Sequence, residues 1–276
     1  MKSQKIKAIS FDAIGTLVEF RHPPHQVYAR FLYENSSFNN ELSDDQKFAA
    51  FKKSYKKINS LYPCYGWKQR ISDDEWWKMV IRDTWLEYGA AIEDFQGILD
   101  QATAELMDWF TSSVGYTLVP GSTQLLDNLR KNGYILGILS NSDSSLGKVL
   151  ADLGILEFFS FVIQSSSTGL SKPDPEFFAL ALNKFNLTVS TNNRASKLNQ
   201  PPTSNCLQPS QILHIGDDFK RDFVGALSAG FSSVLISQKD KYQCKNDPLF
   251  SYFEHKNSFG IIRNLNEIEN LNLEIK

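Results

Sequence analysis

The spacing of hydrophobic and polar residues changes twice along the chain. Residues 6–11 form a short, mostly apolar run that ends at Asp12, which is typical of a buried parallel strand. From about His25 to Ser113 the pattern is helical and amphipathic, and it predicts about four helices with no strand between them. We therefore expect an all-helical insert directly after the first strand.

Two of these helices carry a recognisable start signal. The segments Ser43–Gln46 and Ser72–Glu75 both fit the capping box, in which a serine and a residue three positions later satisfy each other's backbone amides. Both also place acidic residues near the positive end of the helix dipole.

After Pro120 the pattern predicts helices and strands that alternate. The predicted helices span 122–131, 146–153, 175–185 and 219–229, and the predicted strands span 134–139, 158–164, 211–215 and 232–236. Such alternation predicts an α/β fold with a doubly wound parallel sheet. We assign 1–20 and 119–276 to this core and 21–118 to the helical insert.

One segment interrupts this alternation. Residues 188–209 are rich in Asn, Ser, Thr and Pro and have no apolar periodicity. Because the flanking helix and strand are clear, we interpret the segment as a disordered surface insertion without a catalytic role.

Composition narrows the class of protein. The 276 residues carry a formal net charge of −2, so electrostatics gives no reason to expect nucleic acid or an anionic membrane as partner. No run of 18 apolar residues and no ordinary signal peptide is visible. Cys64, Cys206 and Cys244 are far apart and are interpreted as free thiols. These features favour a cytoplasmic protein, and the sequence does not indicate its oligomeric state.

Polar residues gather where the predicted strands end. Asp12 follows the first strand, Ser140 and Asn141 follow the second, and Asp217 and Asp218 follow the strand at 211–215. Ligands of doubly wound sheets bind at the carboxyl ends of the strands, so these positions predict the functional site.

Four short motifs, in order along the chain, resemble those of the haloacid dehalogenase superfamily. They are Phe11–Leu17, similar to D-x-D-G-T-L; Leu139–Asn141; the lysine motif Lys172–Pro175; and Gly216–Asp222, similar to G-D-x-x-x-x-D. Each motif alone is a weak signal of the family, whereas all four in order, each beside the expected strand, are a specific signal. The resemblance spans about residues 6–237 and implies a Rossmann-like core whose helical insert is a cap of the family's first type.

The resemblance also implies roles for single residues. Asp12 would be the nucleophile that forms an aspartyl-phosphate, and Lys172 would offset the developing negative charge. Mg²⁺ would bind the side chains of Asp12 and Asp217 and the main-chain carbonyl of Ile14. Ser140, Asn141 and Lys172 would bind the phosphate of a small phosphorylated metabolite, and Asp222 would orient Lys172 or a metal-bound water.

Other polar and aromatic residues have plainer interpretations. Asp218 fits a helix-start acid, and His214 fits a core histidine within a strand. His22 and His25 fit hinge or packing positions where the chain leaves the core. The pair Trp76–Trp77 fits the packing of the cap, with one ring as a candidate to face the substrate.

Position 14 departs from the family's phosphatase pattern. There the second residue after the nucleophile is an aspartate that serves as general acid and base, and here it is Ile14. General acid–base catalysis contributes about 10²–10⁴-fold, so its loss predicts weak or unusual phosphohydrolase activity that favours good leaving groups.

Three further hypotheses stay open. A metal-independent 2-haloacid dehalogenase has a similar first motif, but it lacks an acidic fourth motif and needs an arginine, for which Arg30 is available. A catalytically impaired member would bind phosphate or a partner. The chain resembles a eukaryotic subgroup of dehalogenase-like domain-containing proteins in which this second carboxylate is also absent, including at Arg21–Pro23 and from Tyr65 to Trp77. A phosphonate hydrolase would use Lys52 or Lys53.

Overall fold

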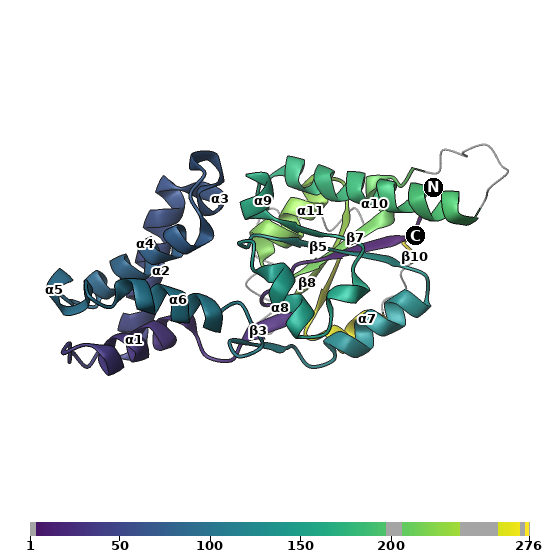
Figure 1. The fold of residues 1–276 in the computed structure, drawn as a ribbon. Helices are drawn as coiled ribbons and strands as arrows, with labels where there is room; N and C mark the ends of the chain where they lie inside the picture. The colour runs from purple at the N-terminus through teal and green to yellow at the C-terminus, as the bar shows by residue number, and fades with distance from the viewer. Residues whose placement is uncertain (1–3, 197–205, 238–258, 271–273, 276) are drawn as a thin grey trace.

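A parallel sheet forms the centre of the computed structural model, which describes residues 4–196, 206–237, 259–270 and 274–275 (Figure 1). In this part of the chain, six strands lie in the order β6-β5-β2-β7-β8-β9, and every neighbouring pair is parallel. Their bounds are Ala8–Phe11 (β2), Ile135–Ser140 (β5), Val162–Gln164 (β6), Ile212–Gly216 (β7), Ser232–Ile236 (β8) and Phe259–Ile262 (β9). Strands are added on both sides of β2, so the predicted Rossmann-like, doubly wound α/β fold is confirmed.

Helices cover both faces of the sheet. In Figure 1, α7 and α8 lie on one face, and α10 and α11 lie on the other. The helices and short turns of the core are α7 (Ser122–Lys131), α8 (Leu146–Asp152), η2 (Leu156–Phe158), α9 (Ser165–Thr168), α10 (Pro175–Ser196), η3 (Pro209–Gln211), the π-helix η4 (Phe219–Val224), α11 (Gly225–Ser228) and η5 (Leu265–Asn270). Outside the sheet, β1 (Gln4–Lys5) pairs antiparallel with β10 (Glu274–Ile275).

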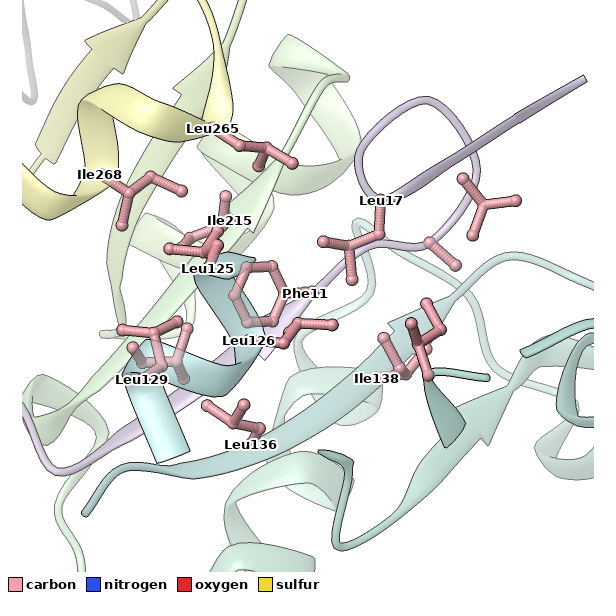
Figure 2. Packing of buried hydrophobic residues seen from close by; sticks show 14 of the residues in the cluster. Phe11, Leu17, Leu125, Leu126, Leu129, Leu136, Ile138, Ile215, Leu265 and Ile268 are labelled. Atoms are coloured by element: carbon pink, nitrogen blue, oxygen red, sulfur yellow. The ribbon is translucent and has the colours of Figure 1, made fainter. Parts of the chain in front are cut away.

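Both faces of β2 are buried, which explains its continuous apolar run. Ile9 and Phe11 belong to the cluster that includes Leu126 of α7, as Figure 2 shows for Phe11 and Leu126. Ala8 points to the other face and joins the cluster of Phe177 on α10. A parallel strand that packs against helices on both sides has no polar face, so its sequence shows no alternation.

The helical cap is inserted between two short strands. β3 (Val18–Phe20) and β4 (Tyr116–Leu118) pair antiparallel, and the chain between them builds the cap, which Figure 1 shows beside the core. Its elements are α1 (Pro24–Asn35), α2 (Asp44–Leu61), α3 (Pro63–Gly66), η1 (Trp67–Gln69), α4 (Asp73–Glu87), α5 (Ile92–Phe95) and α6 (Leu99–Trp109). Trp76 and Trp85 are fully buried in a separate cap core.

The two predicted capping boxes are confirmed. Ser43 accepts from the backbone amide of Gln46, whose side chain accepts from the amide of Ser43. Ser72 and Glu75 exchange the same pair of bonds at the start of α4. Each box satisfies two of the amides that have no partner within the helix.

Helix α10 corrects the predicted insertion. The helix continues to Ser196, whereas the sequence interpretation placed disorder from residue 188 onward. The hydroxyls of Thr188 and Ser190 donate to carbonyls four residues earlier, at 3.0 and 2.9 Å. These bonds satisfy the two hydroxyls within the helix, so neither needs a partner elsewhere in the protein. Residues 197–205 lie outside the described part of the chain.

Two expectations drawn from composition concern thiols and membranes. Cys64 and Cys206 are free thiols, and Cys244 lies outside the described residues. None of the helices in the described ranges combines the length and the apolar character that crossing a membrane requires.

Candidate active site

Three of the predicted site residues meet at one edge of the sheet. Asp12 follows β2, Ser140 ends β5, and Asp217 follows β7. Because β2 lies between β5 and β7, these side chains come from adjacent strands. The amide of Asp12 donates to the carbonyl of Ile215 at 2.9 Å, which extends the β2–β7 ladder to the predicted nucleophile.

Lys172 forms the cationic centre of this edge. Its Nζ lies 2.6 Å from Oδ1 of Asp12 and 2.7 Å from Oδ1 of Asp222, and its side chain is almost completely buried. Burial alone would lower the pKa of the lysine, but the attraction of the two carboxylates outweighs it and raises the pKa. Lys172 therefore stays charged beside Asp12.

Asn141 fixes the main chain of the lysine. Its Oδ1 accepts from the amide of Lys172 at 2.8 Å, and its Nδ2 donates to the carbonyl of Lys172 at 2.9 Å. Both polar atoms of the side chain are thus engaged in positioning. The predicted phosphate-binding role of Asn141 stays a prediction, as does that of Ser140, which is buried and lines the cavity described below.

Asp222 connects Lys172 to a buried histidine. Its Oδ1 contacts Nε2 of His214 at 3.1 Å, and its Oδ2 accepts from the amide of Asp218 at 3.0 Å. Nδ1 of His214 lies 2.9 Å from Oγ of Ser10. Burial would raise the pKa of Asp222, yet Lys172 and the histidine bond hold it well below its usual range.

The sequence predicted the burial of His214 but not its partner. The sequence interpretation placed it in the core, where it is completely buried on β7, but missed its contact with Asp222. Burial lowers the pKa of His214, so the ring is neutral and, with its proton on Nε2, donates to Asp222. A buried polar side chain in an apolar strand requires a partner, and an acid eight residues later was the available signal.

The acidic residues can accommodate a divalent cation. Oxygen atoms of Asp12, Asp217 and Asp222 lie within 4.8 Å of one another. The oxygens of Asp222 already contact Lys172, His214 and the Asp218 amide, which leaves Asp12 and Asp217 as the better side-chain ligands. Burial raises the pKa of Asp12 to about 7, and repulsion from Asp222 adds to the rise. Asp217 is exposed at the edge of the cluster, and partial desolvation together with the charge of Asp222 raises its pKa to about 6. A cation would relieve that repulsion.

Gly15 brings the main chain close to the same cluster. Its φ is +94°, and a Cβ at this position would lie 2.4 Å from Oδ2 of Asp217. A side chain here would displace the carboxylate, so glycine permits the close approach. The peptide next to Ile14 thus lies near Asp217, consistent with the predicted carbonyl ligand.

A cavity of about 710 Å³ extends from Asp12 to the cap. Ile14 lines it at the position where the family's phosphatases carry an acid. Aromatic side chains dominate the opposite wall: Phe20, Tyr28, Phe48, Phe51, Tyr55, Tyr65, Trp77, Phe110 and Tyr116.

Tyr65 and Trp77 of the cap each form a hydrogen bond with the core above the site. Tyr65 donates from its hydroxyl to the carbonyl of Asn141 at 3.1 Å, and Nε1 of Trp77 donates to Oδ2 of Asp143 at 2.6 Å. Tyr65 has a φ of 58° and Cys64 a φ of 51°, a left-handed conformation that is unfavourable for residues other than glycine. Tertiary contacts such as these hold the strained turn in place.

Comparisons with known proteins agree with this geometry. The family model described as haloacid dehalogenase-like hydrolase matches residues 6–230. The chain belongs to the haloacid dehalogenase-like hydrolases. It is 27% identical to haloacid dehalogenase-like hydrolase domain-containing protein 3 of Mus musculus, over 84% of this chain and 82% of the relative. It is 29% identical to the rhythmically expressed gene 2 protein of Drosophila melanogaster, over 85% and 84%. Resemblance to the eukaryotic domain-containing subgroup is thereby confirmed.

Solved structures of the family share the fold. The HAD-hydrolase YfnB from Bacillus subtilis, bound to magnesium, superposes with a TM-score of 0.61 at 22% identity and covers 97% of this chain and 98% of its own. A 2-haloacid dehalogenase from Pseudomonas syringae superposes with a TM-score of 0.59 at 18% identity, over 96% and 97%. At these identities the likeness establishes the architecture.

Three basic cap residues considered for other family activities do not line the cavity. Arg30 stacks on the ring of Trp109, 5.0 Å from its centroid. Lys53 pairs with Glu87 at 2.7 Å on the cap surface, and Lys52 is exposed. The dehalogenase and phosphonate-hydrolase hypotheses therefore lack their required cap residue within the site.

Replacing Asp222 with asparagine tests whether Asp222 positions Lys172. The amide nitrogen would replace either Oδ1, which contacts both Lys172 and His214, or Oδ2, which accepts from the Asp218 amide. All three partners donate, so at least one buried contact is lost. We expect kcat to fall by about 10–100-fold, as is usual for residues that orient a site, with a smaller change in KM. Steady-state kinetics with a phosphate ester and a thermal melt measure the two effects. A lower melting temperature with unchanged kcat would show that Asp222 is only structural.

Proposed function

We propose that the protein is a Mg²⁺-dependent phosphohydrolase that acts on a small phosphorylated metabolite through an aspartyl-phosphate on Asp12. The observation that carries the proposal is the grouping of Asp12, Asp217 and Asp222 around Lys172. A haloacid dehalogenase needs no such acidic cluster, since a halide leaves without metal or proton. Phosphoryl transfer needs both a nucleophile and positive charge to offset the phosphate oxygens.

In the first step, one oxygen of Asp12 attacks phosphorus and the bond to the leaving oxygen breaks. Lys172 holds Oδ1 of Asp12 at 2.6 Å, which leaves Oδ2 available for attack. The ammonium of Lys172 and the hydroxyl of Ser140 would stabilise the transferred phosphoryl oxygens. Mg²⁺, held by Asp12, Asp217 and the carbonyl of Ile14, would supply further positive charge.

In the second step, water attacks phosphorus and the bond to Asp12 breaks, which regenerates the carboxylate. Ile14 can neither protonate the leaving group in the first step nor activate water in the second. We infer that alkyl esters react slowly and that the aspartyl-phosphate accumulates. An aryl phosphate, whose leaving group hardly needs a proton, is the substrate on which the activity should be visible.

Hydrolysis of p-nitrophenyl phosphate with and without Mg²⁺ tests the proposal. We expect Mg²⁺-dependent release, either as turnover or as a burst of about one equivalent from a trapped intermediate. Release of halide from 2-chloropropionate in the absence of metal would instead support the dehalogenase hypothesis. Mg²⁺ binding without release of nitrophenol or halide would support the catalytically impaired hypothesis.

Metal binding has a readout that is independent of activity. Mg²⁺ at about 100 times its dissociation constant should stabilise the folded protein by about 2.7 kcal/mol and raise its melting temperature. Asp217→Asn should remove most of that shift, because it removes one of two side-chain ligands and leaves the fold intact. Asp218→Asn is the matched control, since Asp218 caps η4 by accepting from the amides of Lys220 and Arg221. An equal shift in both variants would contradict the assigned site.

A further inference from the structure

A carboxylate without a cationic partner lies in the wall of the cavity, away from the nucleophile's own cluster. Asp143 lines the cavity, and its oxygens accept from three neutral donors: Nε1 of Trp77 at 2.6 Å, and the amide and hydroxyl of Ser145 at 2.9 and 2.5 Å. Among the described residues, no lysine, arginine or histidine forms an ion pair with it.

The basic residues of the cavity each have another acidic partner. Lys172 is held between Asp12 and Asp222. Two others also line the cavity: Arg221 lies 3.8 Å from Asp218, and His25 lies 3.2 Å from Asp44. No basic side chain of the cavity therefore pairs with Asp143, whose oxygens accept from neutral donors.

Aromatic residues line the cavity together with this carboxylate. The rings of Tyr55 and Tyr65 each lie 6.0 Å from the ring of Trp77, which donates to Asp143. Tyr28, Tyr55, Tyr65 and Tyr116 line the same cavity as Asp143. Faces of aromatic rings attract cations, and the attraction strengthens where water is excluded.

From this arrangement we propose that the substrate's leaving group carries an organic cation, such as an alkylammonium, which binds between Asp143 and the rings of Tyr55, Tyr65 and Trp77. The inference rests on the proposed phosphohydrolase and names its substrate class: phosphate esters of amino alcohols. Burial raises the pKa of Asp143, and a bound cation would offset that cost.

The chemistry of such a substrate also suits Ile14. An ammonium group close to the ester oxygen withdraws electrons and stabilises the departing alkoxide, so less protonation of the leaving group is required. The phosphate end would lie at Asp12 and Lys172, and the cationic end at the cap. One cavity contains both sets of residues.

Two esters of matched shape test the inference. Phosphocholine and 3,3-dimethylbutyl phosphate differ by a quaternary nitrogen in place of a quaternary carbon. We expect kcat/KM to be roughly tenfold higher for phosphocholine, from cation–π and carboxylate attraction together. Asp143→Asn and Tyr55→Leu should each lower the ratio. The electronic effect of the ammonium on the leaving group is the same in every variant, so this decrease reports the cation site.

The matched control variant is Asp73→Asn. Asp73 also accepts from the core, at the amide of Ser144 (2.9 Å), but it does not line the cavity. It removes a charge and a cap–core contact without changing the cavity wall, so the ratio should stay high. Melting temperatures and p-nitrophenyl phosphate rates of all variants show whether each one folds.

Failure of the inference differs from failure of the proposed function. Equal kcat/KM for the two esters, with p-nitrophenyl phosphate still hydrolysed, would overturn the cation site and leave the phosphohydrolase standing. If no phosphate ester reacts, calorimetric binding of choline against 3,3-dimethylbutanol decides the inference alone. Preference for choline that is lost in Asp143→Asn supports it, and equal or absent binding overturns it.

Discussion

Asp12→Asn should lose Mg²⁺-dependent release of nitrophenol from p-nitrophenyl phosphate by a factor on the order of 10³ or more. Asparagine has nearly the same shape, but its neutral amide is a poor nucleophile and a poor metal ligand. Lys172 would lose one of the two carboxylates that hold its Nζ, at 2.6 Å, and keep Asp222 at 2.7 Å. Burst and steady-state release should both disappear, since no covalent intermediate can form at position 12.

The control for this variant is Asp218→Asn, in which an acid next to Asp217 is replaced. Asparagine is also a good helix cap, so η4 should form as before and most of the activity should remain. Asp12→Asn removes charge from a crowded cluster, and we expect its melting temperature to be close to that of the native protein. Full activity in Asp12→Asn would exclude Asp12 as nucleophile. An equal loss of activity in both variants would show that removing any negative charge from this region has the same effect.

Local sequence patterns predicted several strands of this α/β fold but not all of their bounds. Strands β5, β7 and β8 agree with prediction to within one residue at each end, because each is a buried apolar run bounded by polar residues. Strand β6 begins only at Val162, four residues after its predicted start, because Phe158 belongs to η2 and residues 159–161 form no strand. Composition alone cannot separate a short apolar turn from the start of a strand.

Residues with a fixed place in a motif were easier to predict than residues that meet across the two domains. The motif order brought Asp12, Lys172 and Asp217 together: Asp12 and Asp217 directly follow neighbouring strands, and Lys172 lies between α9 and α10. Trp77 and Asp143 are 66 positions apart and meet only when the cap packs on the core. No local periodicity encodes such a contact, so the cap-side wall of the cavity required the structure.

Replacing Ile14 with aspartate should raise activity, because the variant supplies the missing general acid and base. Ile14 is half-buried and lines the cavity two residues after Asp12, on a turn whose conformation Gly15 sets. An acid here would be near the carboxylates of Asp12 and Asp217, and burial and repulsion would favour its protonated form before the reaction. That is the form needed to protonate a leaving alkoxide.

The gain should depend on the leaving group. We expect kcat/KM for an alkyl phosphate to rise by about 10²-fold or more, with a smaller rise for p-nitrophenyl phosphate, whose phenolate leaves without help. Any burst should be replaced by steady turnover, since the new carboxylate can activate water in the second step. Ile14→Asn is the matched control: it has the same size as the aspartate variant and the same loss of apolar packing, but no transferable proton. If the two variants hydrolyse alkyl phosphates equally fast, proton transfer at position 14 does not limit hydrolysis, and the fit of the substrate against the cap would limit it instead.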